Sequence, residues 1–258
     1  MSSLAMLPLN VAGGIATLTL DRPPVNAMND EWVAAFHARL DELETREGWS
    51  VLHIRSAHAV FSAGADLAQM RERFTDAGLE PQLASIREYQ RLFTRIEAFP
   101  AVTLAEIGGA ALGGGFELAL VCDLRIAAHE ARLGLPELQL GLLPGAGGTQ
   151  RLTRLCGRPT ALRLILGAET VDGVAAEALG LVQWTAPAAE LAARAAEIAA
   201  RYAALPAHAA RAAKACIALA ADPDADGFAA EINHTRSLLQ SAPTRALIGA
   251  FLARSVRR

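Results

Sequence analysis

The chain has 258 residues and a formal net charge of −3, which suits one large domain or a domain with a smaller lobe. Hydrophobic residues make up 52% of the sequence, enough for a substantial core. The balance is mildly acidic and lacks the basic footprint of a nucleic-acid-binding protein, so no nucleic-acid partner is expected.

The three cysteines, Cys122, Cys156 and Cys216, have no metal-ligand spacing and predict buried thiols in a reducing compartment. The N-terminal sequence MSSLAMLPLN lacks a basic segment followed by a long apolar one, so no signal peptide is expected. Residues 101–122 have the length of a membrane span, but two glutamates and many glycines argue against insertion. We therefore expect a cytoplasmic protein with no membrane partner.

The first third of the chain alternates strand-like and helix-like segments. Apolar runs at 4–9 and 15–20 predict a hairpin around the Gly13-Gly14 turn. A helix is expected to begin at Asn29 or Asp30, and its apolar face comprises Trp32, Phe36, Leu40 and Leu43. A short strand at 51–55 and a capped turn at 67–73 follow.

Residues 72–81 are polar and contain Gly78 and Pro81, which predicts a mobile loop. A helix then ends before Pro100. Further helices are expected at 158–167 and 172–179, and after Pro187 at 190–205, 207–221, 227–240 and 244–254. This change in composition divides the chain into a mixed α/β domain, 1–200, and a helical lobe, 201–258.

The central stretch, 101–152, combines a strand, a glycine-rich loop and the start of a helix. Glycines allow close approach of the backbone to a ligand, and the first N–H groups of a helix lack intrahelical partners. Such a loop suits an oxygen that acquires negative charge. Glu117 follows Gly114 by three residues, and Glu137 follows Pro136. Two carboxyl groups beside such a site could act as base and acid. Either glutamate alone is better explained by its favourable interaction with a helix dipole.

Three segments, FSAGADL, IGGAALGGGFELALVCDLRIAA and LGLPELQLGLLPGAGGTQRL, closely resemble the crotonase family, the enoyl-CoA hydratase/isomerase superfamily. They occur in the family's order, and the resemblance covers nearly the whole chain. It implies an α/β fold, a crotonase-like spiral of ββα units followed by a C-terminal helical lobe. Composition and periodicity alone indicate only an α/β protein.

The resemblance also implies the chemistry. Backbone N–H groups of Ala65 and Gly114 would form an oxyanion hole for the thioester oxygen of an acyl-CoA. Glu117 and Glu137 match the two glutamates of hydrating members: Glu117 would take a proton from water, and Glu137 would protonate the α-carbon. The implied reaction is the hydration of a 2-trans-enoyl-CoA to a 3-hydroxyacyl-CoA in fatty-acid or related acyl-CoA degradation.

The substrate contacts implied by the resemblance are Ala27, Ser62, Ala63, Gly64, Ala65, Asp66, Leu67, Gly113, Leu135, Leu143, Pro144 and Gly145. Core packing explains Leu135 and Leu143 equally well, and helix capping explains Asp66 better. Relatives often carry a lysine at the position of Ala68, which leaves the phosphate contacts open. The arginines considered for them are Arg22, Arg254, Arg257 and Arg258, and a solvated charge explains each of these better.

Two other functions stay open: an enoyl-CoA isomerase that uses one glutamate as a proton shuttle, and a non-catalytic acyl-CoA-binding protein. No metal or redox cofactor is expected, since coenzyme A belongs to the substrate and no histidine pair has metal spacing. Gly145-Ala146-Gly147-Gly148 lacks the preceding strand of a dinucleotide-binding loop. Relatives form trimers, often paired into hexamers, so the resemblance implies a homotrimer or hexamer.

Overall fold

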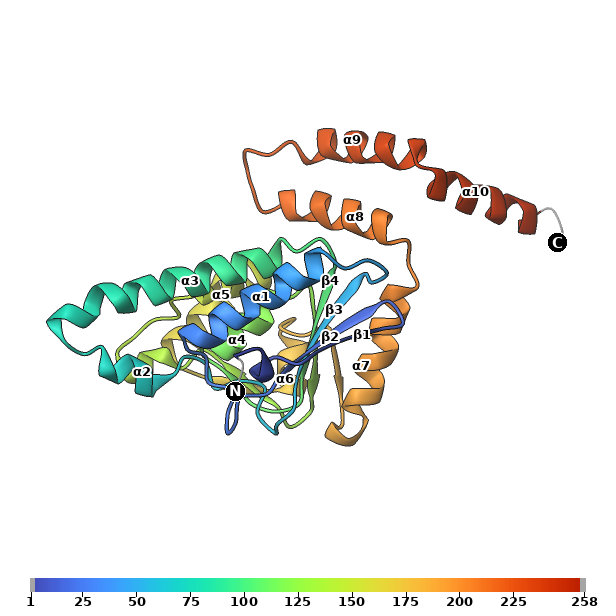
Figure 1. The fold of residues 1–258 in the computed structure, drawn as a ribbon. Helices are drawn as coiled ribbons and strands as arrows, with labels where there is room; N and C mark the ends of the chain where they lie inside the picture. The colour runs from blue at the N-terminus through green and yellow to red at the C-terminus, as the bar shows by residue number, and fades with distance from the viewer. Residues whose placement is uncertain (1–2, 256–258) are drawn as a thin grey trace. The chain divides into compact units, whose positions relative to one another are not determined.

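The structure is a computed structural model that describes residues 3–255 (Figure 1). The chain forms two compact units, the first extending to Ala204 and the second beginning at Leu205. The boundary predicted at residues 200 and 201 falls inside helix α7 (Ala188–Ala203), and the division lies just after that helix. The roles of the two units stay predictions.

The first unit is built on two sheets. In the larger sheet β2, β3, β4, β6 and β9 are parallel neighbours in chain order, and β1 pairs antiparallel with β2. In the smaller sheet β7 lies between β5 and β8. The strands are β1 (Leu9–Ala12), β2 (Ile15–Leu20), β3 (Val51–Ser56), β4 (Val102–Ile107), β5 (Ala111–Leu112), β6 (Leu124–Ala128), β7 (Arg132–Gly134), β8 (Thr170–Asp172) and β9 (Trp184–Ala186).

From β4 onward the chain passes repeatedly between the sheets: β4, β6 and β9 join the larger one, while β5, β7 and β8 join the smaller one. Helices connect many of these strands. Each time the chain returns to the larger sheet, it adds one parallel strand beside the previous one. This alternation builds the expected spiral of ββα units, and the predicted α/β fold class is confirmed.

Helices surround the sheets (Figure 1). Helix α7 packs on β2, β3, β4, β6 and β9. The core between the elements includes fully buried aromatic side chains, Trp32, Phe36, Phe61, Phe93 and Phe116. The remaining helices of this unit are α1 (Asp30–Glu44), α2 (Leu67–Glu72), α3 (Leu79–Glu97), α4 (Gly114–Leu120), α5 (Gly148–Leu166) and α6 (Gly173–Ala178), with 3-10 helices η1 (Ser3–Met6), η2 (Asp76–Gly78) and η3 (Glu137–Leu140).

The N-terminal hairpin differs from the prediction. The turn at Gly13-Gly14 is present, with φ of 59° and 81°, but its first strand begins only at Leu9. The residues before it form η1, and the guanidinium of Arg39 donates hydrogen bonds to the carbonyls of Leu4 (3.0 Å) and Leu7 (2.8 Å). The carbonyls of Met6 and Pro8 still accept backbone hydrogen bonds from Asp21 and Thr19, both at 2.9 Å, so the Arg39 bonds hold a 3-10 turn where the strand was expected.

Helix α3 begins earlier than predicted, and in α5 the predicted helix 158–167 is preceded by a further helical segment. Helix α3 starts at Leu79 and includes Pro81 in its first turn, where a missing N–H costs nothing. The polar segment before α3 is correspondingly shorter than the expected loop. Helix α5 starts at Gly148 and continues through a kink at Gly157, where φ is 76°.

The second unit contains α8 (Ala207–Leu219), α9 (Gly227–Gln240) and α10 (Ala242–Ser255), close to the predicted ranges. Helix α9 packs against both α8 and α10, yet neither α8 nor α9 contains a buried residue. Large apolar side chains such as Ile217, Phe228 and Ile232 are exposed. No helix within residues 3–255 is long and apolar enough to cross a bilayer.

Candidate active site

Two glycine-containing loops approach each other closely at the start of α4. A Cβ atom on Gly115 would lie 2.2 Å from the carbonyl oxygen of Ser62, and one on Gly114 would lie 2.5 Å from the Met28 side chain. Gly113 has φ of 54°, a backbone conformation that favours glycine. Glycine at these positions is therefore required to bring loop 62–66 against the helix start.

The approach leaves two backbone donors side by side. A Cβ on Gly114 would lie 3.6 Å from the nitrogen of Ala65, and one on Gly64 would lie 2.8 Å from the nitrogen of Gly114. Within residues 3–255, neither the Ala65 N–H nor the Gly114 N–H donates a backbone hydrogen bond. Both residues line one cavity. Unpaired N–H groups of this kind are costly unless water or a ligand accepts from them.

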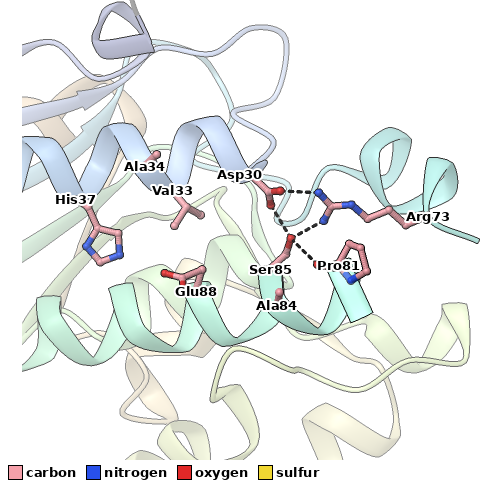
Figure 2. A pocket seen from close by; sticks show the side chains of 9 residues that line it. All are labelled: Asp30, Val33, Ala34, His37, Arg73, Pro81, Ala84, Ser85 and Glu88. Carbon is pink, nitrogen blue, oxygen red and sulfur yellow. Dashed lines mark hydrogen bonds and ion pairs between the residues drawn. The ribbon is translucent and has the colours of Figure 1, made fainter. Parts of the chain in front are cut away.

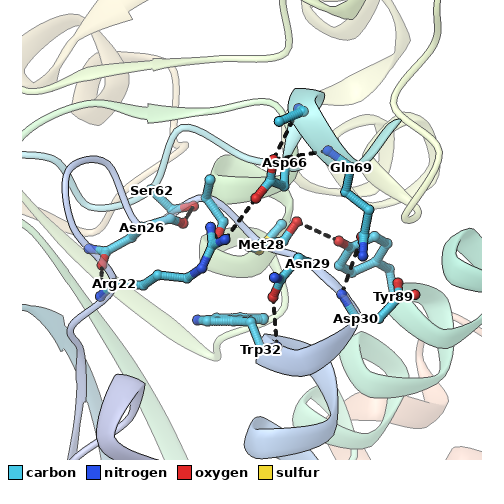
Figure 3. Close-up of polar contacts among 12 residues, drawn as sticks. Arg22, Asn26, Met28, Asn29, Asp30, Trp32, Ser62, Asp66, Gln69 and Tyr89 are labelled. Carbon is cyan, nitrogen blue, oxygen red and sulfur yellow. Dashed lines mark hydrogen bonds and ion pairs between the residues drawn. The ribbon is translucent and has the colours of Figure 1, made fainter. Parts of the chain in front are cut away.

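The Ala65 donor is held in place by hydrogen bonds around Met28, of which Figure 3 shows the one from Tyr89. The Met28 N–H donates to the Gly64 carbonyl at 2.8 Å, and the Asp66 N–H donates to the Met28 carbonyl at 2.8 Å. The hydroxyl of buried Tyr89 donates to the same carbonyl at 2.7 Å, and burial raises the pKa of that hydroxyl. Since the peptide groups on both sides of Ala65 are fixed, the direction of its own N–H is fixed too.

Asp66 has a structural role in this loop. Its carboxylate accepts from the N–H groups of Ala68 (3.0 Å) and Gln69 (3.2 Å) at the start of α2, and it pairs with Arg22 at 2.8 Å. Burial raises the pKa of the Asp66 carboxyl, but the bonds from Arg22 and the helix start outweigh it, and the net pKa is lowered. Arg22 also donates to the carbonyl of Ala27 at 2.7 Å, so its guanidinium is bound within the protein.

Asn26 also supports this loop through hydrogen bonds. Sequence reasoning did not predict a role for it. It is fully buried and has φ of 50°. Its side-chain amide donates to Ser56 Oγ at 2.8 Å and to the Phe61 carbonyl at 3.0 Å. Ser62 in turn donates through its hydroxyl to the Asn26 carbonyl at 2.8 Å. Buried Ser62 is therefore part of the scaffold of loop 62–66 (Figure 3).

Glu117 projects from α4 and is only 3% exposed. Its Oε1 accepts hydrogen bonds from the backbone N–H groups of Ala146 (2.9 Å) and Gly148 (2.7 Å). Burial raises the pKa of the Glu117 carboxyl to about 7; the two N–H donors oppose the rise, and the charge of Glu137 adds to it. A carboxyl with such a pKa exchanges protons readily near neutral pH.

Glu137 is the first residue of the 3-10 helix η3. A Cβ on Gly113 would lie 3.1 Å from its Oε1, so the carboxyl lies directly beside the glycine loop. Its Oε2 is buried and has no hydrogen-bond partner in the described part of the chain. Burial raises the pKa of this carboxyl as well, which favours the protonated form.

Both glutamates line one cavity of about 830 Å³, large enough for an extended small molecule. The predicted residues at its wall are Ala63, Ala65, Leu67, Gly113, Gly114, Glu117, Glu137, Leu143 and Gly145. The structure thus brings both predicted catalytic carboxyls and both predicted N–H donors to a single cavity.

Other predicted contact residues do not line this cavity: Ala27, Ser62, Gly64, Asp66, Leu135 and Pro144. Leu135 is fully buried in the core, which agrees with the packing alternative. Gly64 has φ of 89° and contributes a close backbone approach. These residues shape the loops around the cavity without forming its wall.

Sequence reasoning missed the apolar wall contributed by α2, α3, η3 and the segments that follow α2 and η3. It includes Met70, Phe74, Leu79, Ile86, Leu140 and Leu142. Phe74 is 72% exposed and Leu79 is 59% exposed. Both are large apolar side chains in an otherwise polar stretch of sequence. Such isolated apolar residues were the one sequence feature that could have predicted this wall.

A second cavity of about 470 Å³ lies between α1 and α3 (Figure 2). Asp30, Arg73 and Ser85 meet there: Arg73 pairs with Asp30 at 2.5 Å, and the Ser85 hydroxyl donates to Asp30 at 2.6 Å. Arg73 also donates to the Ser85 hydroxyl. Because Arg73 lines both cavities, this cluster ties the end of α2, and with it one wall of the larger cavity, to α1 and α3.

Among residues 3–255, no group of His, Cys, Asp and Glu side chains could hold a metal ion.

Cys122 is buried as expected, whereas Cys156 and Cys216 are only partly buried, so the prediction of three buried thiols is wrong for these two. Arg254 is exposed on α10, and Arg257 and Arg258 lie outside the described residues.

Residues 10–255 match the family model described as enoyl-CoA hydratase/isomerase. The chain belongs to the enoyl-CoA hydratase/isomerase family. A probable enoyl-CoA hydratase of Bacillus subtilis is 45% identical over 169 residues, 65% of this chain and 64% of the relative. The mitochondrial enoyl-CoA hydratase domain-containing protein 2 of Bos taurus is 45% identical over 171 residues, 66% of this chain and 56% of the relative. These matches span less than two thirds of either relative.

Solved structures of this family match over more of the chain. An enoyl-CoA hydratase from Bacillus anthracis superposes with a TM-score of 0.90 and 30% identity, covering 96% of both chains. An enoyl-CoA hydratase from Polaromonas sp. JS666 gives a TM-score of 0.91 and 30% identity, covering 96% of this chain and 97% of its own. The family resemblance inferred from the three sequence segments is confirmed.

Proposed function

We propose that this family member is an enoyl-CoA hydratase, which adds water to a 2-trans-enoyl-CoA and gives a 3-hydroxyacyl-CoA. One observation carries the proposal: two carboxyl groups with raised pKa, Glu117 and Glu137, share a cavity with two unpaired backbone donors. Hydration needs a group that removes a proton and a group that delivers one. A protein that only binds acyl-CoA has no use for two such carboxyls.

The unpaired N–H groups of Ala65 and Gly114 are proposed to bind the thioester oxygen. When the water oxygen adds to the β-carbon, electron density moves to the thioester oxygen and gives it enolate character. Donors that are already oriented stabilise this charge without reorganisation, and removal of one such donor costs roughly 10²–10³ in rate. The hydrogen bonds around Met28 supply that orientation for Ala65.

The two glutamates are proposed to act in opposite protonation states. Ionised Glu117 takes a proton from water as the water oxygen bonds to the β-carbon, and protonated Glu137 delivers a proton to the α-carbon. The O–H bond of water, the O–H bond of Glu137 and the π bond of C=C break, while a C–O bond, a C–H bond and the O–H bond of Glu117 form. Glu117 then loses its proton and Glu137 regains one by exchange with solvent, so the net reaction is the addition of one water. The raised pKa of each carboxyl makes this division accessible near neutral pH.

The apolar wall of the cavity, formed by side chains such as Phe74, Leu79 and Ile86, is proposed to receive the acyl chain. The CoA portion would then lie along Ala63 and Leu67, which border the same cavity. The proposed reaction needs no metal or redox cofactor, because water and the acyl-CoA are its only reactants. Fatty-acid or related acyl-CoA degradation, in the cytoplasm, is the proposed setting.

The second unit is proposed to support a homotrimer or a hexamer made of two trimers. Large apolar side chains of this unit, including Ile217, Phe228 and Ile232, are exposed, and exposed apolar patches mark interaction sites when they are contiguous. Light scattering at micromolar concentration would show the trimeric or hexameric mass. A monomeric mass would contradict this part of the proposal.

A paired assay tests the function. Purified protein is given a 2-trans-enoyl-CoA and, separately, the 3-enoyl isomer, and both products are followed by absorbance and mass. The proposal expects loss of the conjugated enoyl absorbance with a gain of one water from the first substrate. Faster double-bond migration than hydration would favour the isomerase alternative, and tight binding without turnover of either substrate would favour the non-catalytic one.

A further inference from the structure

The loop between η3 and α5 and the first residue of α5 carry the two donors to Glu117. The peptide group that joins Gly145 to Ala146 donates its N–H to Glu117 Oε1 at 2.9 Å. The carbonyl of this same peptide group, on Gly145, accepts a hydrogen bond from the side-chain amide of Gln90 at 2.7 Å. Because a peptide group is planar, fixing its carbonyl also fixes the direction of its N–H.

The next peptide group is held by a second side chain. The Ala146 carbonyl accepts from Arg151 Nη1 at 2.9 Å. Arg151 is itself anchored by an ion pair with Glu97 at 2.9 Å. Side chains of α3 and α5 therefore hold two successive peptide groups of this loop.

We propose that Gln90 and Arg151 are positioning residues for Glu117, which hold the loop 145–147 so that the N–H groups of Ala146 and Gly148 remain on its carboxylate. This inference rests on the proposed function in one respect: it treats Glu117 as the group that must be ionised for turnover. Neither residue lines the cavity, so neither is expected to touch the substrate.

Several charged groups face Glu117 or its cavity, and they determine which variant is informative. Glu137 on η3 disfavours the ionised carboxyl, and Arg151 on α5 favours it. Arg73 and Asp76 line the same cavity. Gln90 is neutral, so its replacement by another neutral residue changes no charge around Glu117. Any effect must then pass through the Gly145–Ala146 peptide group, where hydrogen bonds in series polarise one another.

The test is the pH dependence of kcat/KM in Gln90→Met, which keeps the side-chain length and removes the donor. A weaker Ala146 hydrogen bond favours protonated Glu117, so the acid limb should move to higher pH by about one unit, a tenfold change in the protonation equilibrium. At pH values above the limb Glu117 is ionised in both proteins. Because the variant changes only this protonation equilibrium, kcat/KM should there return to within about threefold of the parent value.

Arg151→Met should move the limb further, because it removes a positive charge as well as a hydrogen bond. Arg87→Met is the matched control, since Arg87 lies on the same helix as Gln90 and its side chain is 65% exposed. This control should leave the limb in place. A Gln90→Met enzyme that loses rate equally at every pH, with an unmoved limb, would overturn the proposal.

An independent readout separates this inference from the hydratase proposal. Infrared titration can follow the Glu117 carboxyl as the band that disappears in Glu117→Gln. If the parent protein does not hydrate enoyl-CoA but Gln90→Met still shifts this titration upward, the positioning role stands and the proposed function fails. If the titration is unchanged in Gln90→Met, the positioning role is wrong, whatever the enzyme's activity.

Discussion

Gly148→Ala is expected to disable the site by displacing Glu117. Gly148 is the first residue of α5, and a Cβ there would lie 2.8 Å from Glu117 Oε1, 2.9 Å from its Cγ and 2.9 Å from Pro144 Cβ. The new methyl group would be confined between these two residues, so the carboxyl must yield by roughly half an ångström. A displacement of about 1 Å can cost 10²-fold in rate, and kcat should therefore fall by about tenfold. Overpacking should also cost about 1–3 kcal/mol of stability.

The assay is kcat for hydration, normalised to the fraction of protein that binds a saturated acyl-CoA, together with urea unfolding. Gly227→Ala is the matched control, since Gly227 is also the first residue of a helix and a Cβ there meets nothing within 4 Å. Its kcat should equal that of the parent. A folded Gly148→Ala protein with unchanged kcat would refute the argument that the position of Glu117 limits turnover.

Three further results are expected. Because burial raises the pKa of Glu117 to about 7 and the base must be ionised, kcat/KM should rise with pH through an acid limb near 7; a limb near the ordinary glutamate pKa would contradict this. Hydrogen exchange in residues 67–78, where only Gly78 is buried, should be faster than in β4 and should slow with a saturated acyl-CoA; exchange as slow as in β4 would be inconsistent with a weakly packed wall. Asn26→Ala should lower the free energy of unfolding by about 2–4 kcal/mol in urea titration, because it leaves several buried groups unpaired; a loss below about 1 kcal/mol would show that the scaffold does not depend on this amide.

Periodicity and capping predicted most of the helices. The cap at Asn29 and the apolar face with Trp32 and Phe36 were predicted, and both side chains are fully buried. Asp172 caps α6 and Gly180 follows it with φ of 74°, close to the predicted ends. Capping residues and apolar faces lie within one turn of the helix that they define, so they can be recognised from the sequence alone.

The remaining features depend on partners that are distant in sequence. The segment before Leu9 was predicted as a strand, but Arg39 on α1 fixes its carbonyls. Arg125 is only 3% exposed in β6 and donates to the carbonyls of Cys122 and Leu181. No local pattern shows that a buried arginine will find such acceptors, because the fold alone brings them together.

The site divides in the same way. Motif positions identified Glu117, Glu137, Ala65 and Gly114, and all four line one cavity. The support behind them was not visible, because Gln90 lies 55 positions from the carbonyl that it holds. Contacts of this kind are set by how α3 packs beside the loop, which only the folded chain shows.

The central claim is that Glu117 and Glu137 act together on one water molecule, and the hydration rate of a 2-trans-enoyl-CoA tests it most directly. Glu117→Gln and Glu137→Gln should each lower kcat by about 10²–10⁴, and the double variant should be little worse than the poorer single one, because groups that act as a unit are not additive. Binding of a saturated acyl-CoA should change little, since the thioester oxygen is assigned to the N–H groups of Ala65 and Gly114. Near-normal hydration by either single variant would contradict the two-carboxylate account.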